Sequence, residues 1–229
     1  MRTIHLRPLA IAAAVLVSLA SVVAAQDKPT AVLNSLEVRQ LVARAEPADH
    51  VRLTAHFSAL GDRYTAEAKR HVSMSQSFIG NPSRNLGTGM SVHCKRLADL
   101  NTQSATTVRE LAAYHEKLAS GAPAALPKDG ARFQAGAGAP EPSEKELNAL
   151  AAKASTRAEH RALEEYFQTL AKRYTNDANE HVTLAQTYRG TRIAQAAVHH
   201  DRLAGLARDA AKEATAAAEM HRGLAGVAR

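Results

Sequence analysis

Cysteine, tryptophan and catalytic motifs are scarce or missing from this chain. Cys94 is the single cysteine among 229 residues, and there is no tryptophan, so an intrachain disulfide cannot form. The sequence has no C-x-x-C-H haem-attachment motif, no E-x-x-H pair, no H-E-x-x-H or G-x-S-x-G motif, and no phosphate loop or dinucleotide fingerprint. Enzymatic chemistry is therefore not indicated, although an open metal position would permit it.

The only long apolar stretch stands at the start of the chain. Leu9 to Ala25 is almost unbroken in apolar residues, follows the basic residues Arg2 and Arg7, and ends in Val23-Ala24-Ala25, which resembles a cleavage site. This pattern predicts a signal peptide over residues 1–25, cleaved near Ala25, and export to a periplasm or the exterior. No later run is long enough to span a membrane. The net charge of +7 comes without a dense Lys/Arg stripe, which argues against nucleic acid as a partner.

The remaining sequence has the composition and periodicity of helices. Apolar residues and histidines recur at alternating spacings of three and four, which is the a/d seam of a helix packed against another. Gly80-Asn81-Pro82, Gly87 and Gly89 predict a loop, while Thr156 with Glu159 forms a capping box and Pro47 suits a first turn. The expected long helices are Pro47–Ile79, Met90–Ser120, Arg157–Arg189 and Ile193–Gly226, and the expected short ones are Leu33–Ala45 and Glu144–Ala154.

The chain repeats itself. Residues 48–80 align without a gap on residues 158–190, with 13 identities in 33 positions, and after a four-residue deletion Val92 to Leu100 aligns on Val198 to Leu206. The repeat predicts an all-α fold in which internally duplicated helical hairpins form an antiparallel four-helix bundle, each hairpin preceded by a short helix. The two hairpin repeats would span residues 26–121 and 144–229. Residues 122–143, rich in Gly, Ala and Pro, would form a linker.

Four histidines are kept in both copies. His50, His71, His93 and His115 align on His160, His181, His199 and His221. Facing residues in an antiparallel hairpin have residue numbers with a constant sum, which is 165 for His50 and His115 and 164 for His71 and His93. The corresponding sums in the second copy are 381 and 380. We therefore expect two facing histidine pairs in each hairpin, whereas His56, aligned with Tyr166, is expected at the flank.

Packing the hairpins together would gather four histidines at each of two levels. If the order is up-down-up-down, the outer pairs of both copies meet; if the linker crosses the bundle, each outer pair meets the other copy's inner pair. Neutral imidazoles in a protein interior suit transition metals. Cys94 and His200, which follow His93 and His199, are additional ligand candidates, and a thiolate favours copper or zinc. Glu67 and Asp177 lie one turn before His71 and His181 and would either orient an imidazole N–H or add an oxygen ligand.

The sequence thus predicts an exported helical bundle that binds copper or zinc, with copper ahead, for sequestration, delivery or resistance. Its metal ligands would be drawn from His50, His71, His93, Cys94, His115, His160, His181, His199, His200 and His221. One alternative is haem b held between two facing histidines. Another is an interaction or chaperone-like protein whose histidines are structural or sense pH. A protein partner, or a dimer formed by exchange of hairpins, is compatible with each of these functions.

Overall fold

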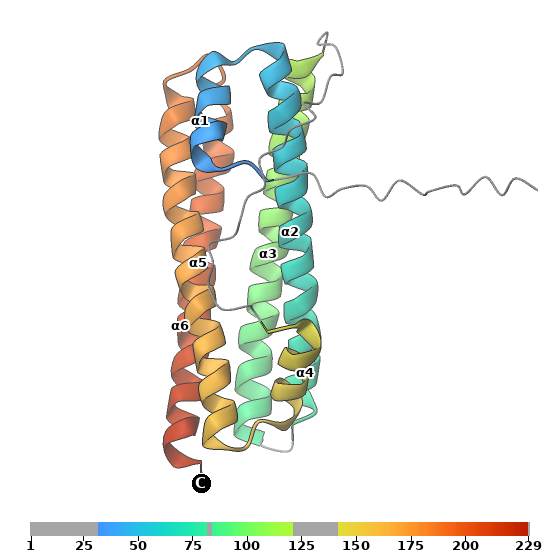
Figure 1. Cartoon of the computed structure of the whole chain (residues 1–229), viewed down its shortest axis with the longest axis vertical. Coiled ribbons are helices and arrows are strands. Elements are labelled where there is room, and N and C mark those ends of the chain that lie inside the picture. Colours follow the sequence, from blue (N-terminus) through green and yellow to red (C-terminus); the bar gives the residue numbers. More distant parts are fainter. Residues whose placement is uncertain (1–31, 82–83, 121–141, 229) are drawn as a thin grey trace, which may run out of the picture.

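The computed structural model describes residues 32–81, 84–120 and 142–228, and helices are the only regular secondary structure over these ranges. Four long helices lie side by side with two short ones (Figure 1). The predicted signal peptide and most of the predicted linker lie outside the described residues. The helices are α1 (Ser35–Arg44), α2 (Pro47–Ile79), α3 (Arg84–Ala119), α4 (Glu144–Lys153), α5 (Arg157–Arg189) and α6 (Ala196–Val227).

Local signals in the sequence locate most helix ends. The bounds of α2 and α5 are those predicted, with proline in the first turn of α2 and the Thr156–Glu159 capping box at α5. The start of α3 differs from the prediction: the helix begins at Arg84 and not at Met90, and Gly87 and Gly89 lie inside it rather than in a loop. A Cβ on Gly89 would stand 2.7 Å from Cε of Met220. The missing side chain thus makes room for the neighbouring helix, and it does not break α3.

The helices pack as two hairpins joined along one side. α2 runs along α3, α5 runs along α6, and the hairpins meet where α3 packs against α6. Within the described residues, the backbones of α2 and α5 do not come into contact. Instead α1 and α4 each lie across α2 and α5, at opposite ends of the molecule (Figure 1). These contacts are compatible with the expected bundle.

The core is divided between the two ends. At the α1 end, the start of α2 and the end of α3 pack with the end of α5 and the start of α6, around residues such as Phe57 and Tyr188. At the α4 end, the end of α2 and the start of α3 pack with the start of α5 and the end of α6, around Phe78 and Phe167. The start of α2 and the end of α5 therefore lie at the same end of the molecule and contribute side chains to the same core. This is the second of the two arrangements considered above, in which each outer pair lies at the same end as the other copy's inner pair.

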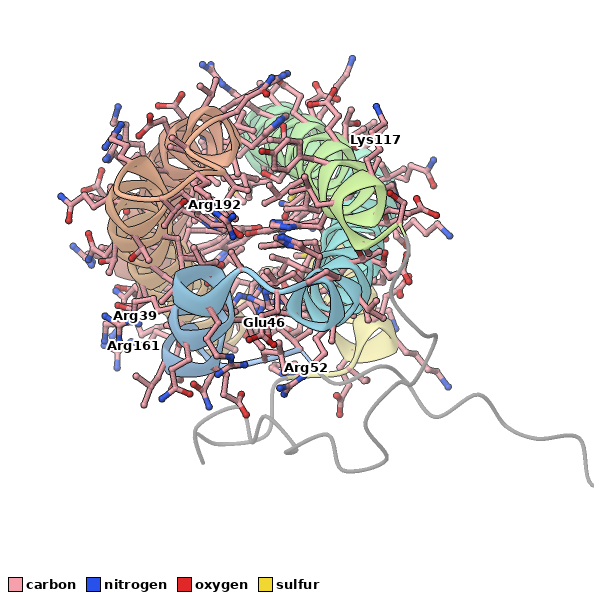
Figure 2. All side chains as sticks on the ribbon, turned by 90° about the horizontal axis from the view of Figure 1, so that it is seen from above. Arg39, Glu46, Arg52, Lys117, Arg161 and Arg192 are labelled. Atoms are coloured by element: carbon pink, nitrogen blue, oxygen red, sulfur yellow. The ribbon has the colours of Figure 1, made fainter. Side chains whose placement is uncertain are left out.

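The surface is charged and carries no membrane-spanning segment among the described helices. Seen from the α1 end, charged side chains stand around the outside of the long helices (Figure 2). None of the described helices holds a stretch apolar enough to cross a bilayer. The exposed large apolar residues include Val72 on α2 and Val198 on α6.

We expect Leu53→Ala to lower the free energy of unfolding by about 2–5 kcal/mol, because the side chain is fully buried and its removal leaves a cavity. The matched control is Leu36→Ala on the exposed face of α1, which should change stability by less than about 0.5 kcal/mol. Urea denaturation followed by circular dichroism measures both. Equal effects of the two substitutions would contradict this assignment of the core.

Candidate functional site

Three pairs of histidines face each other inside the hairpins. Nδ1 of His50 lies 3.0 Å from Nδ1 of His115, and Nδ1 of His160 lies 3.3 Å from Nδ1 of His221. Both of these outer pairs confirm the prediction from the repeat. The third pair joins His181 to His200, with Nδ1 atoms 3.2 Å apart. In each pair one ring can donate its N–H to the lone pair of the other, so the contact can form with both rings uncharged.

The predicted inner pairs, His71 with His93 and His181 with His199, are wrong by one residue. Nδ1 of His93 lies 2.6 Å from a carboxylate oxygen of Glu213, and Nδ1 of His199 lies 3.6 Å from one of Glu110. Both histidines thus reach across the contact between α3 and α6. His93 and His199 help to join the hairpins and do not face His71 and His181.

The seam of α3 explains the error. Alternating steps of three and four back from His115 reach Leu111, Val108, Ser104, Asn101, Leu97, Cys94 and Met90, all of which are buried. This count places Cys94 on the seam and His93 beside it. The residue numbers of His71 and Cys94 sum to 165, and those of His181 and His200 to 381, the same sums as in the outer pairs. The histidines identical in the two copies, His93 and His199, lie beside the seam, whereas Cys94 and His200 lie on it.

At the α1 end, aromatic residues separate two histidine pairs. The Phe57 ring centroid lies 5.5 Å from that of His115 and 5.7 Å from that of His200, and Tyr188 lies 5.8 Å and 5.0 Å from the same two rings. The predicted four-histidine level is therefore replaced by two pairs with Phe57 and Tyr188 between them. Within the described parts of the chain, no three His, Cys, Asp or Glu side chains gather closely enough to hold one metal ion together.

Tyrosine hydroxyls engage the outer nitrogens of the α1-end pairs. The Tyr188 hydroxyl lies 2.8 Å from Nε2 of His115, and the Tyr64 hydroxyl lies 3.4 Å from Nε2 of His181. A hydroxyl both donates and accepts, so it can serve either tautomer of the ring. Each tyrosine thus supports a histidine from the side opposite its partner.

The α4 end lacks both of these hydroxyl contacts. Phe78 takes the position aligned with Tyr188, and Nε2 of His221 has no hydrogen-bond partner. Tyr174 aligns with Tyr64, but its hydroxyl accepts a hydrogen bond from the Asn101 amide at 2.7 Å instead. His71, which is completely buried, has no partner for either ring nitrogen. The two ends share their architecture and differ in their polar chemistry.

Glu67 and Asp177 pair with arginines of the opposite hairpin. A carboxylate oxygen of Glu67 lies 2.9 Å from Arg173, and one of Asp177 lies 3.3 Å from Arg63. Arg63 and Arg173 are themselves aligned in the repeat, so the two ion pairs are reciprocal. The predicted role of Glu67 and Asp177 in orienting an imidazole is therefore replaced by a role in joining α2 to α5.

Burial keeps the paired histidines neutral. Desolvation, with smaller contributions from nearby imidazoles, lowers the pKa of His115, His181 and His221 to about 3 in each case. The pKa of His200 is also lowered, first by burial and then by His181. For His50 burial is the main cause of a lowered pKa, with a smaller contribution from Arg192, which is labelled in Figure 2. The rings therefore present lone pairs at neutral pH.

His56 is the histidine whose position the sequence misjudged most. It is buried rather than at the flank, and its Nδ1 accepts a hydrogen bond of 2.9 Å from the backbone N–H of Leu33, just before α1. The aligned Tyr166 is buried as well. Burial lowers the pKa of His56 to about 4. A neutral His56 is thus needed to hold the segment that leads into α1.

Exchanging the aligned Tyr188 and Phe78 tests the polar difference between the ends. Tyr188→Phe leaves Nε2 of His115 without its hydroxyl and should lower stability by about 1 kcal/mol. Phe78→Tyr offers a hydroxyl to the unpartnered Nε2 of His221 and should raise stability by a similar amount. Tyr114→Phe is the control, since no hydrogen bond of that hydroxyl is found within the described residues. Thermal unfolding measures the stability of all three variants. A loss of stability in Phe78→Tyr would contradict the proposed polar difference between the two ends.

Acid should destabilise the protein through His56. Because its pKa is lowered in the folded state, the unfolded chain takes up the proton first, so stability is complete above about pH 6.5 and falls towards pH 4. This one group accounts for at most about 1.4 kcal/mol per pH unit. His56→Gln keeps an acceptor but cannot titrate, so its plot of stability against pH should be less steep over this window. Chemical denaturation at several pH values measures the slope, and an unchanged slope would contradict the assignment.

No protein-family model, curated protein or solved structure matches this chain. The functional interpretation therefore rests on the buried histidines, their partners and the chemistry of the two ends.

Proposed function

We propose that this chain is an exported copper-binding protein that holds Cu(I) between facing histidines inside an internally duplicated four-helix bundle. The observation that carries the proposal is the set of three buried pairs with Nδ1 atoms 3.0–3.3 Å apart. Sequestration, delivery and resistance are the roles that such a protein would serve.

The geometry favours a two-coordinate ion. A metal–imidazole bond is about 2.0 Å long, so a linear N–metal–N unit needs about 4 Å between the nitrogens. Each pair would have to open by about 0.7–1 Å from its present spacing. Zinc in protein sites takes four tetrahedral ligands, and no such group is gathered within the described residues. A monovalent d¹⁰ ion such as Cu(I) accepts two collinear nitrogen ligands, which is why we place copper before zinc.

The tyrosines fit the bound form as well as the free one. When both Nδ1 lone pairs bind a metal, each neutral ring carries its proton on Nε2. The Tyr188 hydroxyl can accept a hydrogen bond from that N–H of His115, and the Tyr64 hydroxyl can accept one from that of His181. Partners of this kind, on the far nitrogen of a ligating histidine, fix its tautomer and orientation.

Haem is less well accommodated than a single ion. A haem iron would also need about 4 Å between the two nitrogens, and in addition its porphyrin plane would have to pass between rings whose centroids are now 5.1 Å apart. At the α1 end the space beside the pairs is filled by Phe57 and Tyr188. We therefore rank haem b below copper.

The export and duplication parts of the proposal rest on the sequence. The basic, then apolar start of the chain supports a leader. The aligned positions supply reciprocal contacts, namely Arg63 with Asp177 and Arg173 with Glu67. Two copies of one ancestral hairpin, related by a twofold axis across the bundle, would produce such reciprocity.

A second candidate function is an interaction protein with structural or pH-sensing histidines. It is favoured by the same pairs, because each pair already satisfies one nitrogen of both rings by hydrogen bonding. In that case replacing a paired histidine would change stability or partner binding and leave copper affinity as it was.

Copper binding is tested by titrating the mature protein with Cu(I) under anaerobic conditions, in competition with a chromogenic Cu(I) chelator. At a free Cu(I) concentration of about 100 times Kd, bound copper should raise the free energy of unfolding by about 2.7 kcal/mol. Zn²⁺ under the same conditions should stabilise the protein less, because the pairs offer only two ligands.

The variants that test the pairs are His115→Gln and His221→Gln, with His199→Gln as the matched control. Each paired variant should lose the copper held by its own pair, since glutamine can hydrogen-bond but is a poor copper ligand. The control removes a partly exposed histidine outside the pairs and should bind as the wild type does. Copper content unchanged in both paired variants would refute the proposal in favour of structural histidines.

A further inference from the structure

All sulfur atoms of the described chain lie at the α4 end. Met74, Met90 and Cys94 are fully buried in its core, and Met220 packs against them. These residues and Met1 are the only sulfur-containing residues in the sequence. The corresponding core at the α1 end contains none. The two ends therefore differ in the kind of metal ligand that they can offer.

The sulfur atoms replace specific residues of the other copy. Met74 aligns with Leu184, Met90 with Ala196 and Cys94 with His200. At the α1 end, His200 completes a pair with His181. By the alignment and the register of the seam, the corresponding positions at the α4 end are held by His71 and Cys94, an imidazole and a thiol.

His71 gives a separate reason to expect a ligand at the α4 end. It is completely buried, and neither of its ring nitrogens has a hydrogen-bond partner. The aligned His181 has a partner for both. The tyrosine that would serve His71 is held by Asn101, which takes the place of Ala207 in the other copy. An imidazole buried without partners is costly, and a ligand that binds it would remove the cost.

We infer that His71 and Cys94 form a Cu(I) site of mixed nitrogen and sulfur ligation, with the thioethers of Met74 and Met90 as the neighbouring sulfur donors. Soft thiolate and thioether ligands select Cu(I). This inference shares with the proposed function only the requirement that Cu(I) reaches the interior, because its ligands are different.

Binding at this site requires one proton to leave. The S–H bond of Cys94 breaks, a Cu–S bond forms, and the proton passes to solvent, while copper stays monovalent throughout. The thiolate charge then cancels that of the ion, so the buried complex of Cu(I), thiolate and neutral imidazole carries no net charge. An ion between two neutral histidines keeps its positive charge. Because burying a net charge is costly, the site at His71 and Cys94 should bind Cu(I) more tightly than the pairs do.

The test compares wild type, Cys94→Ser and Cys94→His, each loaded anaerobically with Cu(I) alone. In the wild type we expect a thiolate-to-copper charge-transfer band in the ultraviolet and sulfur scattering in the X-ray absorption spectrum. Cys94→Ser should lose the band and hold this copper at least about tenfold more weakly, a difference of about 1.4 kcal/mol. Cys94→His recreates the pair found at the α1 end and should keep the copper with nitrogen ligands only.

Two further variants complete the design. His93→Gln changes the neighbouring residue off the seam and should leave the charge-transfer band as it is. Met74→Leu introduces the aligned residue and should keep the band while reducing the sulfur scattering. Circular dichroism establishes that each variant is folded, and Cys94→Ala serves in place of Cys94→Ser if the latter does not fold.

The outcomes separate this inference from the proposed function. Copper with nitrogen ligands only in the wild type, unchanged by Cys94→Ser, would overturn the sulfur site and leave the histidine pairs standing. A wild type with Cu–S ligation, in which His115→Gln and His221→Gln retain all copper, would support the sulfur site and refute the pairs. A protein that binds no Cu(I) refutes both.

Discussion

Two imidazole rings buried face to face hydrogen-bond when one donates its N–H and the other offers a lone pair, and burial favours the form in which both are uncharged. Three such contacts, with Nδ1 atoms 3.0–3.3 Å apart, occupy the interior of the hairpins. A second proton in any pair would place like charges within hydrogen-bond distance in a poorly solvated core. The paired positions, the aromatic residues beside them and the tyrosine hydroxyls are all consistent with this requirement. The same neutrality leaves nitrogen lone pairs available to a metal ion.

The two ends meet the requirement in different ways. At the α1 end, Tyr64 and Tyr188 extend the pairs into a hydrogen-bonded set. At the α4 end, Phe78 has no hydroxyl to give, Asn101 holds Tyr174, and His71 is left without a partner beside a core that contains sulfur. A buried imidazole without hydrogen-bond partners, such as that of His71, is uncommon in a folded protein and calls for an explanation. This difference is the basis of the sulfur-containing site proposed above.

The interface between the two hairpins also differs from one side of the bundle to the other. α3 packs directly on α6, and His93 and His199 reach across that contact to Glu213 and Glu110. On the other side, α2 and α5 are connected by the reciprocal arginine–carboxylate pairs and are covered at each end by α1 and α4. His56 secures the start of α1 by accepting the Leu33 N–H. The short helices thus complete the side that direct helix packing leaves open.

By itself the sequence determined the helices and half of the pairing. Heptad spacing, the Thr156–Glu159 cap and Pro47 predicted α2 and α5 to the residue, because these signals act within a few turns of one helix. The outer pairs followed from the same periodicity. The inner partners were missed by one residue, since identity between the copies pointed to His93 and His199 while the seam runs through Cys94 and His200. Only the tertiary structure decided which helix ends share a core and which arginines pair with Glu67 and Asp177. It also placed aromatic rings between the histidine pairs at the α1 end. These outcomes depend on contacts between hairpins distant in sequence, and the periodicity of a single helix carries no information about them.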